Sequence, residues 1–176
     1  MAVLPIAKLG NPVLRKVAAP VDVRDIRTKE FQQLIDDMFE TMLDEPGIGL
    51  AAPQVSQSIQ LVVLGCEGEG GFPTTTLINP KIVYYGPQQA EGWEGCLSVD
   101  GLRGKVIRPS VVRVQALDRE GKPVDIEADG LYAVCIQHET DHLIGKLFVD
   151  RMTDLSTLTQ LTEFDKYWRK EPTPVI

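Results

Sequence analysis

The two histidines of this chain lie four residues apart and a glutamate follows the first, in the order His138, Glu139 and His142. On a helix, residues at positions i and i+4 lie on the same face, so the two imidazoles can chelate one metal ion. Glu139 is rotated to the side of that face, where it can reach a water molecule beside the ion. The alternative is a helix with two solvated histidines and an unrelated glutamate. Because the chain has no other histidine, we interpret the pattern as a catalytic metal site.

A catalytic site of this kind needs a third protein ligand. Cys135 is nearest in the sequence, but it would lie roughly 10 Å from His142 along the helix axis, so its side chain cannot reach an ion held by both histidines. Cys96 follows a glycine, where the backbone can approach another element closely. Glu91 and Asp129 also have suitable carboxylates. From chemistry alone, the third ligand stays open among these last three residues.

Hydrophobic spacing and capping residues predict four helices that could position this site. They span residues 12–17, 28–44, 131–144 and 155–169. Asn11 and Asp154 are the expected N-caps of the first and the last helix. The third helix carries both histidines and ends at Gly145. Because it is apolar on most sides, we expect a central helix that buries its metal-binding face.

Short apolar and β-branched runs predict strands separated by turns and a glycine-rich loop. The strands span residues 59–64, 75–79, 81–85, 111–117 and 123–128. Strands interleaved with helices indicate an α+β fold. We expect a single domain of short, mostly antiparallel strands around the central metal-binding helix, with helices near both termini. Residues 1–170 would form the catalytic domain and residues 171–176 a flexible tail.

Charge and cysteine content narrow the class of protein. The net charge of −7 argues against DNA binding, although a local basic patch could still contact the ribosome. Residues 1–10 resemble neither a signal peptide nor a transit peptide, and no stretch is long enough to span a membrane. Three cysteines without a secretion signal indicate reduced thiols, and Cys66 is interpreted as an ordinary one. We therefore expect a cytoplasmic enzyme.

Three segments of the chain resemble the signature motifs of peptide deformylases. They are residues 47–54 (Gly-Ile-Gly-Leu-Ala-Ala-Pro-Gln), 94–98 (Glu-Gly-Cys-Leu-Ser) and 137–143 (Gln-His-Glu-Thr-Asp-His-Leu). They occur in that family's order and at similar separations, within a resemblance that runs from the Asn-Pro pair near the N-terminus to about residue 150. The resemblance implies removal of the N-formyl group from the formyl-methionine of newly made polypeptides, with release of formate. One departure is Asp100, where many relatives have proline.

The resemblance also implies a role for each residue of the site. The implied metal ligands are Cys96, His138 and His142, around one divalent ion, usually Fe²⁺, with Zn²⁺, Ni²⁺ or Co²⁺ as alternatives. Glu139 would be the acid/base, and the Gln54 amide and the Leu97 backbone N–H would form an oxyanion hole. The nascent formyl-methionyl peptide would pair with backbone near Gly49 and Gly95. Its methionine pocket would be lined by Ile48, Leu131, Val134 and Cys135, with Glu94 beside it.

Two other classes of protein share parts of this pattern. A zinc endopeptidase also uses His-Glu-x-x-His, but its third ligand is commonly a downstream histidine or glutamate, and this chain has no further histidine. A non-catalytic metal-binding or redox-sensing protein could use the same three ligands with a closed fourth position. Such a protein has no use for Glu139 or Gln54. The sequence therefore favours a deformylase over both.

Overall fold

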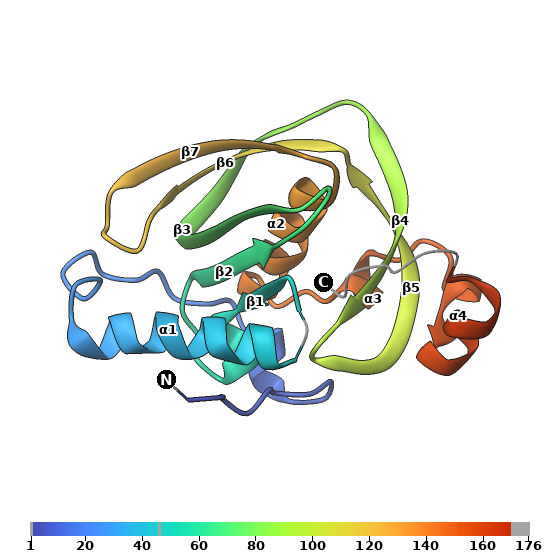
Figure 1. Cartoon of the computed structure of the whole chain (residues 1–176), viewed down its shortest axis with the longest axis horizontal. Helices are drawn as coiled ribbons and strands as arrows, with labels where there is room; N and C mark the ends of the chain where they lie inside the picture. Colours follow the sequence, from blue (N-terminus) through green and yellow to red (C-terminus); the bar gives the residue numbers. More distant parts are fainter. Residues whose placement is uncertain (1, 46, 170–176) are drawn as a thin grey trace.

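The computed structural model describes residues 2–45 and 47–169, in which the larger of two sheets has five antiparallel strands (Figure 1). Its strands, in spatial order, are β1 (Gly49–Ala51), β2 (Leu61–Cys66), β3 (Phe72–Tyr85), β6 (Val111–Leu117) and β7 (Pro123–Asp129). A second sheet contains β4 (Gln89–Cys96), β5 (Val99–Pro109) and β8 (Thr159–Gln160), again antiparallel. The expected α+β class with mostly antiparallel strands is confirmed.

Two helices cover the opposite faces of the five-stranded sheet, α1 (Lys29–Asp44) and α2 (Gly130–Leu143). Side chains alternate between the faces of a strand, and in β2 both faces are buried. Leu61 and Val63 pack in the cluster that contains α1, whereas Val62 and Leu64 pack in the cluster that contains α2. This explains why the strand is apolar throughout, and it places the histidine-bearing helix at the centre of the fold as expected.

Local capping signals define the ends of these helices. The Thr28 side chain accepts a hydrogen bond from the Phe31 N–H at the start of α1. Gly145 has a φ of 71°, and a Cβ there would lie 2.6 Å from the Arg15 carbonyl oxygen, so glycine is required where the chain leaves α2. Asn11 caps the expected N-terminal helix, which is a shorter 3₁₀ helix, η1 (Pro12–Arg15).

The strand predictions were wrong in several places. The strands expected at 75–79 and 81–85 are one strand, β3, because Asn79 adopts a φ of 53° in an irregularity instead of ending the strand. The Asn79 side chain holds this irregularity through hydrogen bonds to the backbone of Val21. Strands β1, β4, β5 and β8 were not predicted. Strand β4 is rich in glycine and glutamate and forms by pairing with β5.

The C-terminal helix expected at 155–169 was also wrong in its first half. Asp154 caps only a 3₁₀ turn, η3 (Leu155–Thr157), because strand β8 then pairs with β5. The helix α4 (Leu161–Tyr167) starts after this strand and packs Phe164 against Trp93. A short helix, α3 (Phe148–Arg151), comes after α2 and was not predicted. The expected tail at 171–176 lies outside the described residues.

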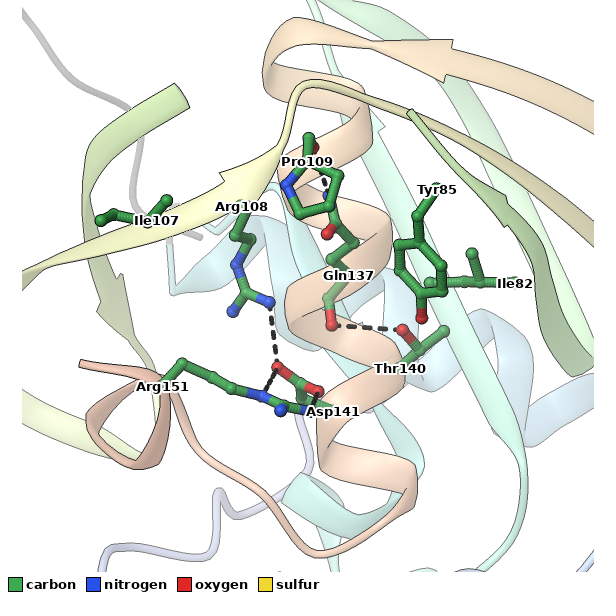
Figure 2. A pocket seen from close by; sticks show the side chains of 9 residues that line it. All are labelled: Ile82, Tyr85, Ile107, Arg108, Pro109, Gln137, Thr140, Asp141 and Arg151. Atoms are coloured by element: carbon green, nitrogen blue, oxygen red, sulfur yellow. Dashed lines mark hydrogen bonds and ion pairs between the residues drawn. The ribbon is translucent and has the colours of Figure 1, made fainter. Parts of the chain in front are cut away.

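The side of α2 away from β1 lines a hollow of about 250 Å³ (Figure 2). Arg108 enters it from β5, Tyr85 from β3, and Asp141 from α2, and Asp141 bonds both Arg108 and Arg151 across it. This hollow is therefore lined by members of a charged network that continues into the interior of the protein. Within the described residues, none of the helices is long and apolar enough to cross a membrane.

Candidate active site and metal centre

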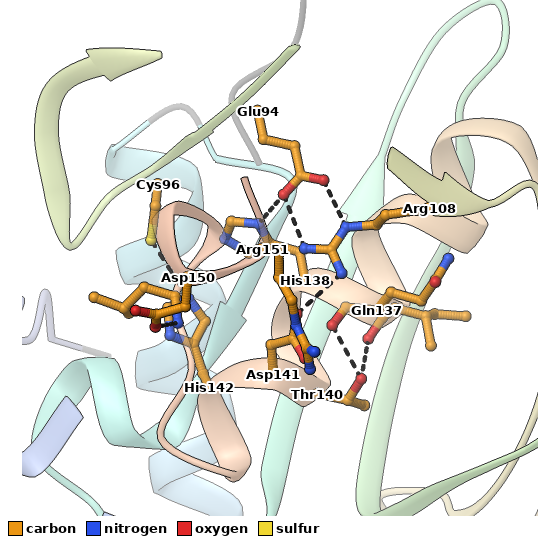
Figure 3. A network of polar contacts seen from close by, with 12 residues as sticks. Glu94, Cys96, Arg108, Gln137, His138, Thr140, Asp141, His142, Asp150 and Arg151 are labelled. Atoms are coloured by element: carbon orange, nitrogen blue, oxygen red, sulfur yellow. Dashed lines mark hydrogen bonds and ion pairs between the residues drawn. The ribbon is translucent and has the colours of Figure 1, made fainter. Parts of the chain in front are cut away.

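Three potential ligands from two elements converge beside β1 (Figure 3). Cys96 is the last residue of β4, and His138 and His142 are on α2. All three are buried, and their ligand atoms lie within 4.8 Å of one another. The Cys96 Sγ is 3.4 Å from Nε2 of His142. This is the arrangement that the family resemblance implied and that the local sequence left open.

The other candidate ligands point elsewhere. Glu91 is exposed and pairs with Lys105, with Oε2 and Nζ 2.7 Å apart. Asp129 is exposed at the N-terminus of α2. Cys135 is buried, and its Sγ donates a weak hydrogen bond to the Ile48 carbonyl oxygen 3.5 Å away, which agrees with its interpretation as a pocket residue. Its complete burial raises the pKa of this thiol well above the ordinary value.

The donor atoms fit a divalent cation. Nδ1 of His138 donates to a Glu94 carboxylate oxygen at 2.8 Å, which leaves the lone pair on Nε2 free. That Nε2 is buried and has no hydrogen-bond partner among the described residues, a costly arrangement unless something else binds it. One thiol and two imidazoles form a donor set typical of Fe²⁺ or Zn²⁺. We conclude that this cluster can hold a metal ion.

Glu94 links His138 to a buried ion-pair network (Figure 3). Its carboxylate accepts hydrogen bonds from Nε and Nη2 of Arg108 at 2.5 and 3.0 Å, and Arg108 also reaches Asp141 at 3.0 Å. Burial alone would raise the pKa of Glu94, but hydrogen bonds from His138 and Arg108 lower it to about 2. Removal of one member of such a buried pair costs about 3–5 kcal/mol. The Glu94 carboxylate fixes the orientation of the His138 ring through its hydrogen bond to Nδ1.

Sequence reasoning missed Arg108 and Asp141. Arg108 had no local signal, because it lies on a strand, β5, that was not predicted. Asp141 had one, since its place three residues after His138 puts both on one side of α2. Glu94 was expected beside the substrate pocket, but both of its oxygens are engaged by other side chains.

Glu139 lies on α2 between the two histidine ligands in the sequence. The residue is fully buried, and both of its carboxylate oxygens are without hydrogen-bond partners in the part of the chain that the structure describes. Burial raises the pKa of Glu139 to about 7, against the effect of His138, which lowers it. A carboxyl group with a pKa near neutrality can both accept and return a proton at physiological pH.

The two expected oxyanion donors both lie next to the ligand Cys96. Gln54 belongs to a buried 3₁₀ helix, η2 (Ala52–Val55), directly after β1. Its Oε1 accepts from the Ala51 N–H at 2.7 Å, and this turns Nε2 toward the Cys96 Sγ, 3.5 Å away. Leu97 comes directly after the cysteine ligand in the turn between β4 and β5. Both residues are thus next to the ligand cluster.

Gly49 makes the close approach between β1 and α2 that the site requires. A Cβ on Gly49 would lie 2.6 Å from Oε1 of Glu139 and 2.8 Å from the Cys135 Sγ. A Cβ on Gly95 would in turn meet the Arg103 guanidinium at 2.1 Å. At both positions the absence of a side chain therefore lets another residue pack directly against the backbone. Of the remaining pocket residues, Ile48 is buried, and Leu131 and Val134 are partly buried against the same core.

We expect Gly49→Ala to lower turnover by about 10²-fold while most of the protein remains folded. The added methyl group must displace the Glu139 carboxylate, and a shift of about 1 Å in a catalytic group can have an effect of that size. Steady-state kinetics with a melting curve would measure it. Gly92→Ala is the matched control, because a Cβ there meets nothing within 4 Å. Equal kinetics for the two variants would contradict the proposed importance of this contact.

The fold and the site together define a class of protein, the metal-dependent hydrolases with a His-Glu-x-x-His helix. Residues 3–157 match the family model described as polypeptide deformylase. Peptide deformylase 2 of Xanthomonas axonopodis pv. citri is 48% identical over 155 residues, which cover 88% of this chain and 90% of that protein. The peptide deformylase of Stutzerimonas stutzeri is 46% identical over 171 residues, which cover 97% and 99%.

Solved structures agree with these matches. The crystal structure of a peptide deformylase from Legionella pneumophila superposes with a TM-score of 0.81 at 41% identity, and covers 97% of this chain and 100% of that one. A Met-Ala-Ser-bound peptide deformylase of class I type b from Acinetobacter baumannii gives 0.82 at 37% identity, over 86% and 99%. The chain belongs to the polypeptide deformylase family. It is a metallohydrolase that removes N-formyl groups from nascent peptides, and the endopeptidase alternative is not supported.

Proposed function

We propose that Glu139 performs the proton transfers of deformylation in this chain. Water attacks the formyl carbon and gives a proton to Glu139, which delivers it to the amine nitrogen as the C–N bond breaks. The products are formate and a free N-terminal amine. The observation that carries this proposal is a buried glutamate, free of hydrogen bonds to the described residues, beside three converging metal ligands. Its pKa of about 7 suits both transfers.

We propose that Cys96, His138 and His142 hold one divalent cation. When bound, the cation supplies Lewis-acid chemistry, since it polarises a carbonyl group and makes water more acidic. The negative charge that grows on the formyl oxygen would be met by the Gln54 amide and the Leu97 N–H. The orientation of the Gln54 amide toward Cys96 supports this role.

We infer that the substrate is an N-formyl-methionyl peptide that lies extended along β1. Within the described residues β1 pairs only with β2, so its other edge has no strand partner, and we propose that the substrate pairs there. A relative crystallised with Met-Ala-Ser supports a peptide of this kind. Ile48, Leu131, Val134 and Cys135 would line the methionine pocket. We propose that Glu94 positions His138 instead of touching the substrate.

We propose that this chemistry takes place on newly made chains in the cytoplasm, with transient contact to the ribosome. The substrate class supports this, because formyl-methionine marks the start of a growing polypeptide. We infer that residues 1–170 act as one catalytic domain in this reaction.

The direct test of the proposed function is a formate-release assay on formyl-Met-Ala-Ser with protein purified under anaerobic conditions. We expect stoichiometric formate and free Met-Ala-Ser, with about one metal ion per chain by elemental analysis. Unformylated peptides of the same length serve as the control and should remain intact. Cleavage of internal peptide bonds without formate release would overturn the assignment.

We propose Fe²⁺ as the native ion, and we expect aerobic handling to inactivate the enzyme. Oxygen oxidises ferrous iron and can oxidise the thiol of Cys96. Protein reconstituted with Ni²⁺ or Co²⁺ should keep its activity in air. Activity half-lives with and without oxygen, measured together with metal content, test this. Full activity after aerobic purification with zinc as the only metal would contradict the iron assignment.

A further inference from the structure

The N-terminal segment formed by residues 7–9 runs beside the β4–β5 turn, along the lower edge of the molecule in Figure 1. Lys8 Nζ donates hydrogen bonds to the Leu97 carbonyl oxygen at 2.9 Å and to Oδ1 of Asp100 at 2.8 Å. The next N–H along the segment, that of Leu9, donates to the Ser98 carbonyl oxygen at 2.7 Å. Both carbonyl groups of the turn are therefore bound by this segment.

The same segment also contacts the other proposed oxyanion donor. The Ala7 N–H donates to the Gln54 carbonyl oxygen at 2.7 Å. Residues 7–9 thus bridge the two elements, η2 and the β4–β5 turn, that provide the Gln54 amide and the Leu97 N–H. No other part of the catalytic proposal uses this segment.

The β4–β5 turn is irregular. Cys96 pairs with Val99, which leaves Leu97 and Ser98 between the paired residues, and the register of the two strands shifts between Glu94 and Cys96. Regular two-residue hairpin loops usually adopt turns with positive φ, because only these match the twist of the strands. Among the described residues, positive φ outside glycine occurs only at Ser56 and Asn79, so this loop has none. Hydrogen bonds from the N-terminal segment can hold a turn of this kind in place.

We propose that Lys8 is a positioning residue for deformylation. It holds the carbonyl group of Leu97, which belongs to the peptide unit directly after the one that carries the Leu97 N–H, and it is itself held in place by Asp100. The inference rests on the proposed role of the Leu97 N–H. It also gives a function to Asp100. The Lys8–Asp100 pair is exposed, with side-chain exposures of 47% and 67%, so the ion pair by itself contributes little to stability. The ion pair matters because it keeps the Lys8 ammonium group beside the Leu97 carbonyl oxygen.

We expect Lys8→Met to lower kcat by about tenfold with KM changed by less than about twofold, since it loosens an oxyanion donor without removing it. Lys8→Arg should recover most of the loss, because its guanidinium can donate to both acceptors. Asp100→Asn should lower kcat by about threefold, and high salt should reduce wild-type kcat in the same direction. The matched control is Lys105→Met, which breaks an ion pair of the same hairpin with Glu91. We expect wild-type kinetics from it.

A measurement that does not depend on activity completes the test. In zinc-loaded protein, the amide ¹H and ¹⁵N signals of Leu97 and Ser98 should move in Lys8→Met and stay in place in Lys105→Met. Unchanged signals together with unchanged kcat would overturn the inference. If Lys8→Met does not fold, Asp100→Asn decides on the same two criteria.

Failure of this inference can be distinguished from failure of the proposed function. If wild-type protein releases formate and Glu139→Gln does not, while Lys8→Met is fully active, only the role of Lys8 is wrong. If the turn signals move but wild-type protein releases no formate, the contact is real and the proposed function is wrong.

Discussion

Cys96→Ser is expected to abolish tight metal binding and to lower formate release by more than about 100-fold. Loss of a partner behind a ligand already lowers metal affinity or activity by about 10–100-fold, so loss of a ligand should have a larger effect. A serine hydroxyl is a poor ligand for a borderline-soft ion at neutral pH, and the substitution would leave two imidazoles to hold the ion alone. Metal content by elemental analysis and kcat/KM, measured on the same preparation, would show both losses together.

Cys66→Ser is the matched control for this change. Cys66 is only half-buried at the end of β2, and it lies outside the ligand cluster. We therefore expect its replacement to leave metal content and activity near the wild-type values. The ligand assignment would be wrong if Cys66→Ser lost its metal and Cys96→Ser kept it.

Glu139→Gln is expected to keep the metal and lose turnover. Glutamine is nearly isosteric with glutamate, and Glu139 is not one of the three proposed ligands. The amide cannot accept a proton from water, so the general-base contribution, typically about 10²–10⁴-fold, should disappear. The loss should appear in kcat with KM largely kept, because the proton is transferred only in the transition state.

The variants Cys96→Ser and Glu139→Gln together test whether metal binding and proton transfer depend on different residues of the site. Metal analysis should separate them, since Cys96→Ser loses the ion and Glu139→Gln retains it. A melting curve should show that both proteins fold. A Glu139→Gln protein that holds its metal and releases formate at nearly the wild-type rate would rule out the proposed mechanism.

The site residues that could be predicted from the sequence are those that lie within a few residues of one another. His138 and His142 are one helical turn apart, so the pairing of their imidazoles can be derived from helix geometry alone. The start of α1 and the end of α2 could also be predicted, from the capping residue Thr28 and from the glycine that follows α2. The amphipathic pattern of α1 matches its burial against the sheet.

The parts that were not predictable depend on contacts distant in the sequence. Cys96 lies 46 residues from His142, and only the family resemblance selected it over Glu91 and Asp129. Strand β4 has a weak intrinsic preference for extended structure and forms because β5 is available to pair with it. Arg108 was missed for this reason. The C-terminal helix was placed too early because β8 takes up the residues before it to pair with β5.

Strand β1 is only three residues long and forms one margin of its sheet. A long uncovered margin would invite other chains to stack there and aggregate, whereas three residues offer too few main-chain groups for a lasting association. Under the proposed binding mode, a peptide that is also held at its formyl group and its first side chain would need only those few contacts. Since main-chain groups are the same in every polypeptide, pairing of this kind would not by itself select the side chains beyond the first residue. One catalyst of this design can therefore serve the many different proteins that a cell makes.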